Sequence, residues 1–237
     1  VGALDGAPLR LIRPDMPGFG ASPPPPLAFD YTAASTTPMW DAALDALSVR
    51  GPLVAVLHDF GGPWFLPWVA RNPDRVRGLV LCNTLFWPGY RWHLWARVWQ
   101  TPGLGELASL VSPEALFRWE MRRGSSGLPV DYCDATAAAS TPAMRACVLR
   151  TYRSHADPAS VWGAEWPRLQ AVLPRIPARV VWGMRDPYLP PHMAERFGVP
   201  VHVVDHAGHW SPVESPDAVV RALRAVLGEG GDPVTLP

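Results

Sequence analysis

Short apolar runs recur along the chain and are separated by longer stretches in which apolar and polar residues mix. Runs of this length, rich in β-branched residues, are typical of strands. The apolar run Val76–Leu81 predicts a strand that is buried on both faces. Strands are predicted at Leu9–Arg13, Leu53–Leu57, Val76–Leu81, Ala178–Trp182 and Val201–Val204.

Segments with helical spacing of apolar residues lie between these runs. A helix is predicted within 31–49, a second from the glycines after Asp59 towards Ala70, and an amphipathic third at Ser215–Leu227, capped by Ser215. Strands and helices that alternate in this way predict a parallel sheet with right-handed crossovers. Residues 228–237 are predicted to be a loose tail.

The pattern changes between Trp87 and about Pro174. This segment is helical in composition, is interrupted by Pro and Gly, and is rich in Trp and Phe. The spacing of Trp92, Trp95 and Trp99 is more typical of helix packing than of a ligand cage.

Composition and charge narrow the class of protein. The 237 residues are 48% hydrophobic and carry 21 acidic and 21 basic side chains, so the sequence predicts a globular protein without a nucleic-acid or membrane partner. No apolar run is long enough to cross a bilayer, and no secretory signal pattern is present, which makes the cytoplasm the expected location. Cys82, Cys133 and Cys147 lack metal-site or redox spacing, so we expect free thiols and neither a metal nor a cofactor.

The most informative stretch is the turn after the second predicted strand. Leu53–Leu57 is followed at once by His58-Asp59-Phe60-Gly61-Gly62 and then by a helix. A strand that turns directly into a helix through paired glycines forces the tip residue into a cramped backbone, because a Cβ at a glycine position would clash with its neighbours. Asp59 is therefore predicted at the tip of a nucleophile elbow. A lone Asp in a loop is more commonly a turn former or a helix cap.

This elbow and other motifs resemble the α/β-hydrolase superfamily, in the branch whose nucleophile is Asp: haloalkane dehalogenases, epoxide hydrolases and fluoroacetate dehalogenases. The resemblance implies a mostly parallel sheet flanked by helices, formed by residues 1–86 and 176–237, with an inserted helical cap at 87–175. Family members also have strands before the first one predicted here, and those N-terminal strands are apparently missing. The motifs, in the order of the family, are PDMPGFGAS (14–22), HDFGG (58–62), RVRGLVLCNTLFWP (75–88), WGMRD (182–186) and AGHW (207–210).

The resemblance also implies roles for site residues. Asp59 would attack an sp³ carbon to form an alkyl ester, His209 would activate water as general base, and Asp186 would orient His209. The backbone N–H of Phe60 would stabilise the oxyanion.

Each of these roles has a rival. Asp186 could simply cap a turn before Pro187, but the earlier strand end, at Cys82-Asn83-Thr84, offers no carboxylate in its place. His206 competes with His209, and His58 is expected to be structural, bonding within the elbow. No G-x-S-x-G motif occurs, so an ordinary serine esterase is disfavoured.

The substrate is the least determined feature. The expected partners are a small apolar substrate and water, and the sequence does not indicate an oligomeric state. Haloalkane dehalogenases have Trp where this chain has Phe60, so a donor from Trp87 or Trp119 would have to bind the halide. Tyr152, in Leu149-Arg150-Thr151-Tyr152-Arg153, resembles the cap tyrosine of epoxide hydrolases.

Three functions therefore remain open. Dehalogenase-like hydrolysis is placed slightly ahead of epoxide hydrolysis. A catalytically silent binding protein is the third reading, in which the aromatic pocket binds a ligand without turnover.

Overall fold

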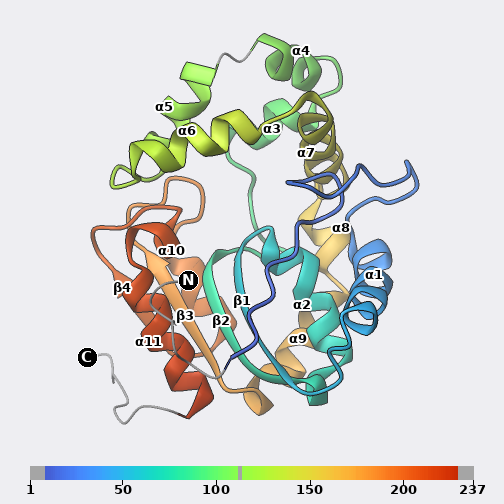
Figure 1. The fold of residues 1–237 in the computed structure, drawn as a ribbon, viewed down its shortest axis with the longest axis vertical. Helices are drawn as coiled ribbons and strands as arrows, with labels where there is room; N and C mark the ends of the chain where they lie inside the picture. Colours follow the sequence, from blue (N-terminus) through green and yellow to red (C-terminus); the bar gives the residue numbers. More distant parts are fainter. Residues whose placement is uncertain (1–8, 112–113, 229–237) are drawn as a thin grey trace.

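A four-stranded parallel sheet forms the centre of the molecule (Figure 1). The computed structural model describes residues 9–111 and 114–228. The parallel pairing is the one that the alternation of strands and helices predicted, and the strands stand in the order in which they occur in the chain. They are β1 (Leu53–Asp59), β2 (Val76–Thr84), β3 (Ala178–Gly183) and β4 (Val201–Val204).

The strand predicted at Leu9–Arg13 does not form, and this prediction was wrong. The segment has no regular secondary structure, and Leu9 and Leu11 are 45% and 51% exposed. A strand needs a neighbour for its backbone hydrogen bonds. Within the described residues β1 is an edge strand that pairs with β2, and residues 9–13 form no ladder with it. An apolar run without such a ladder remains irregular.

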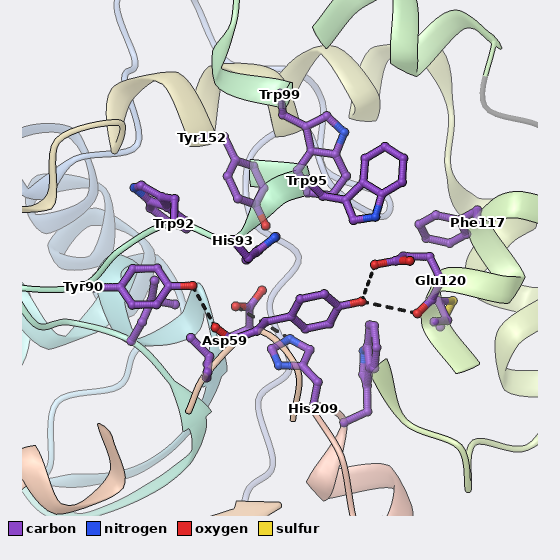
Figure 2. Close-up of a pocket in the computed structure, with 15 residues that line it drawn as sticks. Asp59, Tyr90, Trp92, His93, Trp95, Trp99, Phe117, Glu120, Tyr152 and His209 are labelled. Atoms are coloured by element: carbon purple, nitrogen blue, oxygen red, sulfur yellow. Dashed lines mark hydrogen bonds and ion pairs between the residues drawn. The ribbon is translucent and has the colours of Figure 1, made fainter. Parts of the chain in front are cut away.

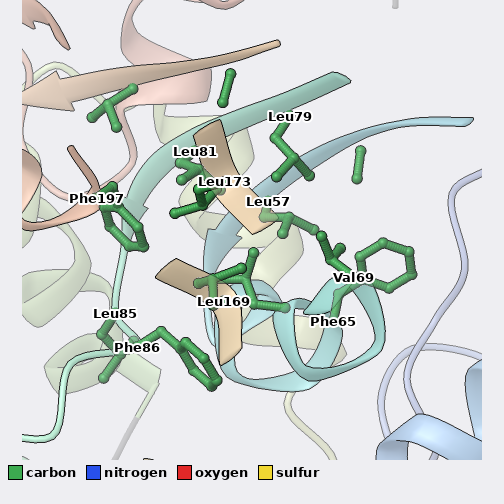
Figure 3. Close-up of a cluster of buried hydrophobic side chains, with 14 of the residues drawn as sticks. Leu57, Phe65, Val69, Leu79, Leu81, Leu85, Phe86, Leu169, Leu173 and Phe197 are labelled. Carbon is green, nitrogen blue, oxygen red and sulfur yellow. The ribbon is translucent and has the colours of Figure 1, made fainter. Parts of the chain in front are cut away.

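Helices cover both faces of the sheet because its side chains alternate. Leu79 and Leu81 of β2 point into a core shared with α2 (Figure 3). Val80 and Cys82 pack against α11 on the opposite face. Both faces of β2 are buried, as its apolar run predicted. The flanking helices are α1 (Ala33–Ala46), α2 (Gly61–Arg71) and α9 (Glu165–Val172) on one side, and α10 (Ser211–Glu214) and α11 (Pro216–Leu227) on the other.

A second group of helices lies beyond the carboxyl ends of the strands (Figure 1). We call α3 to α7 the upper helices; α8 leads back from them to α9. The aromatic-rich segment is thus helical, as its composition predicted. The helices are α3 (Leu94–Gln100), α4 (Leu104–Val111), α5 (Glu114–Gly124), α6 (Val130–Ala139), α7 (Pro142–Ser154) and α8 (Pro158–Trp162).

The remaining elements are short, and one end differs from expectation. Single 3₁₀ segments occur at η2 (Pro73–Arg75), η3 (Leu173–Arg175) and η4 (Pro191–Phe197). Ser215 is the N-cap residue of α11, as predicted, but its side chain makes no capping hydrogen bond. Its backbone, at φ −142° and ψ 63°, departs from the extended conformation that capping requires. The predicted loose tail falls largely on 229–237, outside the described residues. None of the described helices is long and apolar enough to cross a membrane.

Candidate active site

Asp59 occupies a strained turn between β1 and α2. Its φ of 47° lies in the left-handed region, which non-glycine residues seldom adopt. The Thr84 hydroxyl, at the end of β2, donates to the Asp59 carbonyl at 2.6 Å and holds the turn in place. The elbow geometry predicted from the sequence is therefore present.

Only one of the paired glycines is sterically required. A Cβ at Gly62 would come within 2.2 Å of the Thr84 hydroxyl and 2.9 Å of the Leu85 carbonyl, so α2 approaches β2 too closely for any side chain. At Gly61 the nearest atom would be 3.8 Å away, an ordinary contact. The expected clash thus holds for Gly62 and was wrong for Gly61.

The three predicted polar residues meet at one edge of the sheet. Asp59 ends β1, Asp186 follows β3 and His209 follows β4. His209 Nδ1 lies 2.9 Å from Asp186 Oδ2, and His209 Nε2 lies 3.8 Å from Asp59 Oδ1. His209 thus stands between two carboxylates, fixed by one and turned towards the other.

Asp186 is held by a set of buried donors. Its Oδ1 accepts the backbone N–H groups of Tyr188 at 2.8 Å and Leu189 at 3.0 Å. The Asn83 side-chain amide donates to Oδ2 at 2.8 Å, while Asn83 Oδ1 accepts the N–H of Gly183 at 2.8 Å. Asn83 is a positioning residue that the sequence reasoning missed.

The charges of the three residues are coupled. Burial raises the pKa of Asp59, against the opposing effects of His209 and the backbone N–H of Phe60. Burial acts to lower the pKa of His209, but the charge and hydrogen bond of Asp186 outweigh it and raise the pKa. For Asp186, burial acts to raise the pKa, but the charge and hydrogen bond of His209 outweigh it, so the pKa lies below its ordinary value. Asp186 therefore remains ionised and supports a charged His209.

The neighbouring histidines differ from each other in their surroundings. His206 is exposed and is not part of this cluster. His58 Nε2 lies 2.8 Å from the backbone oxygen of His209. Burial lowers the pKa of His58 to about 3, so this ring is neutral. His58 is structural, but it braces the His209 loop; the expected bond within the elbow was wrong.

A cavity of about 150 Å³ opens above Asp59 (Figure 2). Most of its wall is aromatic, and it lies between the elbow and the upper helices. Tyr152 lines it as predicted, and burial together with the Asp59 charge raises its pKa, so the hydroxyl keeps its proton. The lining residues are Asp59, Leu85, Tyr90, Trp92, His93, Trp95, Trp99, Phe117, Glu120, Met121, Tyr152, Tyr188, Leu189, His209 and Trp210.

Both tryptophans predicted for the pocket lie elsewhere. Trp119 is 56% exposed on α5, because the helix turns its face of Met121 inwards and leaves Trp119 in solvent. Trp87 packs beneath the Arg196 guanidinium, which lies 4.4 Å from its ring centroid. Sequence spacing did not reveal which side of each segment would face the cavity.

Phe60 contributes its backbone rather than its ring. The ring is buried against Trp64, Trp92 and Tyr152, and it does not line the cavity. Its backbone N–H favours the ionised form of the Asp59 carboxylate, against the burial that raises the pKa of this group overall.

The upper helices are joined directly to the His209 loop. The carbonyl of Gly124, the last residue of α5, accepts the N–H of His209 at 2.9 Å, and Ser125 Oγ accepts the N–H of Trp210 at 2.8 Å. Glu214 binds the N–H groups of Gly127 at 2.8 Å and Gly208 at 2.6 Å. Residues 124–127 are therefore attached to the loop that carries the candidate base.

Comparison with known proteins places this geometry in a family. Residues 1–222 match the alpha/beta hydrolase family. The chain belongs to that family. It is a hydrolase, and its fold is the α/β-hydrolase fold that the sequence motifs predicted.

Three known proteins illustrate the range of that family. A cis-3-alkyl-4-alkyloxetan-2-one decarboxylase of Xanthomonas campestris is 25% identical, over 92% of this chain and 79% of its own. Haloalkane dehalogenase 2 of Mycobacterium bovis is 27% identical, over 90% and 77%. The solved structure of 2-hydroxy-6-oxo-6-phenylhexa-2,4-dienoate hydrolase from Rhodococcus has a TM-score of 0.69 at 17% identity, covers 89% of this chain and 77% of that one, and shows the shared fold.

Proposed function

We propose that this protein hydrolyses a small apolar electrophile through an alkyl ester on Asp59. One observation carries the proposal: a carboxylate at a strained elbow faces an aromatic cavity and lies 3.8 Å from the Nε2 of a histidine that a second carboxylate orients. An ionised carboxylate is already a nucleophile and needs no base for its attack.

The reaction takes two steps. In the first, Asp59 forms a bond to an sp³ carbon while the electron pair of the breaking bond departs with the leaving atom. In the second, His209 takes a proton from water, and the hydroxide adds to the ester carbonyl and releases the alcohol. Asp186 stabilises the charged imidazole during this step, as in a serine triad.

We assign supporting roles to three further parts of the chain. The N–H of Phe60 stabilises the oxyanion that forms on the ester carbonyl. Residues 87–175 act as a cap that shields the cavity from water, an assignment supported by the upper helices that line it. Tyr152 supplies a hydroxyl donor from this cap.

Carbon–halogen hydrolysis is the first substrate class that we propose. It is supported by the haloalkane dehalogenase relative, which aligns over 90% of this chain. A cavity of about 150 Å³ with mostly aromatic walls suits a short haloalkane, because apolar walls bind the alkyl group and weaken the hydration of the nucleophile.

A strained ring is the second candidate, and a specific feature favours it. Phe60 provides no side-chain N–H for a halide, whereas the Tyr152 hydroxyl lies in the cavity and could donate to the oxygen of an opening epoxide. The oxetanone decarboxylase relative also acts on a strained oxygen ring, according to its name. Both candidates use the same ester on Asp59.

Mass spectrometry on a His209→Gln variant tests the proposal. The substitution leaves Asp59 free to attack but removes the base, so the ester should accumulate. After incubation with short bromoalkanes and epoxides, we expect an adduct on the peptide containing Asp59. An alkyl adduct supports the dehalogenase class, and a hydroxyalkyl adduct supports the epoxide class.

The control is the same variant with Asp59→Asn, which should remain unmodified. Folded His209→Gln protein that forms no adduct from either pool would overturn the proposed ester. Tight binding of these compounds without any adduct would instead indicate a catalytically silent binding protein.

A further inference from the structure

His93 stands at the start of α3, inside the cavity wall (Figure 2). It is the N-cap residue of that helix, and its Nδ1 accepts the backbone N–H of Ala96 at 3.3 Å. Its ring lies 4.8 Å from the ring of Tyr188 and 6.4 Å from that of Tyr152, between centroids. The imidazole is therefore fixed both by a backbone contact and by packing.

The capping contact determines where the ring carries its proton. A nitrogen that accepts a hydrogen bond has no proton of its own, so the neutral ring carries its proton on Nε2. Burial and the nearby charge of His209 lower the pKa of His93 to about 4, and the ring is neutral near pH 7. His93 thus presents a neutral N–H donor.

Several other donors of the cavity wall are already used. The Tyr90 hydroxyl donates to the Tyr188 carbonyl at 3.1 Å, and the Tyr188 hydroxyl donates to Glu120 at 2.9 Å. The Trp92 indole donates to the His155 carbonyl at 2.8 Å.

His93 and Tyr152 keep their donors for the cavity. Within residues 9–111 and 114–228, neither His93 Nε2 nor the Tyr152 hydroxyl makes a hydrogen bond with another protein group, and both residues line the space above Asp59. In the view of Figure 2, His93 stands between Tyr152 and Asp59.

We propose that His93 is a catalytic residue whose Nε2–H, together with the Tyr152 hydroxyl, binds the atom that leaves the substrate carbon. The inference rests on the proposed function. When Asp59 attacks, the electron pair of the broken bond passes to the leaving atom, which becomes a halide ion or an alkoxide. The Nε2–H donates a hydrogen bond to this anion and its proton stays on His93. The donor thus supplies what the side chain at Phe60 lacks.

Two substitutions separate this role from helix capping. His93→Asn keeps an oxygen that can accept the Ala96 N–H, because Asn is a strong N-cap residue, but it has no donor at the position of Nε2. His93→Gln places an amide N–H near the position of Nε2 and loses the cap. A structural role predicts damage from Gln, whereas the proposed role predicts damage from Asn.

The measurement is the rate of adduct formation on Asp59 in the His209→Gln background, with 1-iodobutane, 1-bromobutane and 1-chlorobutane as probes. We expect His93→Asn to slow the chloride reaction by about 100-fold, the scale of one lost oxyanion donor, and the iodide reaction much less, because iodide needs the least stabilisation. His93→Gln should retain most of the rate while its Tm falls.

The outcomes separate this inference from the proposed function. If the folded His209→Gln parent forms no adduct with these haloalkanes or with the epoxide pool, the proposed function and the role of His93 both fail. If the parent reacts and His93→Asn reacts equally fast with all three probes, the ester stands and the role of His93 is overturned. A uniform loss for all three halides, shared by His93→Gln, would indicate a structural role and would also overturn it.

Discussion

An added proton inactivates each of the two groups that are proposed to react in turn, Asp59 and His209. Asp59 is active when ionised, and burial raises its pKa above its ordinary value of 3.8. His209 is active when neutral, and Asp186 outweighs burial to raise its pKa above 6.5. Both steps therefore lose rate as the pH falls, but at different points.

We predict that the ester accumulates in the unmodified enzyme as the pH falls through the pKa of His209, which lies above its ordinary value. In that range protonated His209 cannot take a proton from water, while Asp59 still attacks. In the ester state Asp186 still acts to raise the pKa of His209, while the contribution of the Asp59 charge is lost. Rapid-quench mass spectrometry across pH 5 to 8 measures the two rates. A single shared acid limb for both steps would contradict the prediction.

At this scale the sequence revealed the residues that stand directly after strands. Asp59, Asp186 and His209 could be predicted because parallel strands bring their carboxyl ends to one edge. Asn83 could not, because its role depends on a contact with Asp186, which is 103 residues away. His93 was missed for a similar reason. Its tautomer depends on the hydrogen bond that its Nδ1 accepts from the backbone N–H of Ala96, and the spacing of the tryptophans does not show where that helix begins.

At the scale of elements, the approach of α2 to β2 sets the position of the elbow. The helix can come this close because Gly62 has no side chain, and the Thr84 hydroxyl that a Cβ would displace also holds the Asp59 carbonyl. The Thr84 hydroxyl therefore links the packing of α2 against β2 to the position of the Asp59 carbonyl.

We predict that Gly62→Ala lowers the free energy of unfolding by about 1–3 kcal/mol and reduces the rate of ester formation. The added methyl group must push Thr84 or Leu85 away, which disturbs the turn at Asp59. Gly61→Ala is the matched control, because its Cβ would have only a 3.8 Å neighbour. Its stability should change by less than about 0.5 kcal/mol. Urea denaturation and adduct kinetics measure both quantities, and equal behaviour of the two variants would refute the steric argument.

The sequence predicted those elements that have partners in the sheet. The runs at β1 to β4 became strands because each lies beside another strand, whereas residues 9–13, with three apolar residues and two arginines, form no ladder. Composition measures the tendency of a segment to be buried, but strand formation also requires a neighbour. Ser215 shows the same limit at a helix end, where the residue type was right and the backbone angle was not.

At the scale of the whole molecule, an ion pair links the elbow helix to the end of the aromatic segment. Arg71 of α2 donates to Glu165 of α9 through two bonds of 2.6 and 2.7 Å. The Glu165 side chain is only 10% exposed, whereas that of Arg71 is 34% exposed. Loss of Arg71 would therefore leave a nearly buried Glu165 carboxylate without its main partner, and this is the chief contribution of the pair to stability.

We predict that Arg71→Met lowers the free energy of unfolding by about 2 kcal/mol, because it strands a nearly buried carboxylate. The cost is kept below that of a fully buried pair by Arg168, which also reaches Glu165 at 3.3 Å. Arg168→Met is the control and should cost less than about 0.5 kcal/mol, since that side chain is 57% exposed. Urea denaturation tests both variants, and equal losses would contradict this assignment.

The arrangement of the upper helices was the part least accessible from sequence. Their helical nature could be predicted from composition, but which of their aromatic residues face the cavity depends on how each helix is rotated. Trp119 and Met121 lie two positions apart on α5, and one is exposed while the other is buried. Long-range packing determines that rotation.

The attachment of residues 124–127 to the His209 loop also bears on how such a protein diversifies. Recombination that exchanged the whole aromatic segment for a foreign one would remove the Gly124 carbonyl that the His209 amide requires. Crossover points that retain this short anchor and the start of α3, where His93 stands, would preserve the reaction and leave α4 open to replacement. New substrate ranges are therefore expected to arise by exchange of α4, with residues 124–127 inherited together with His209.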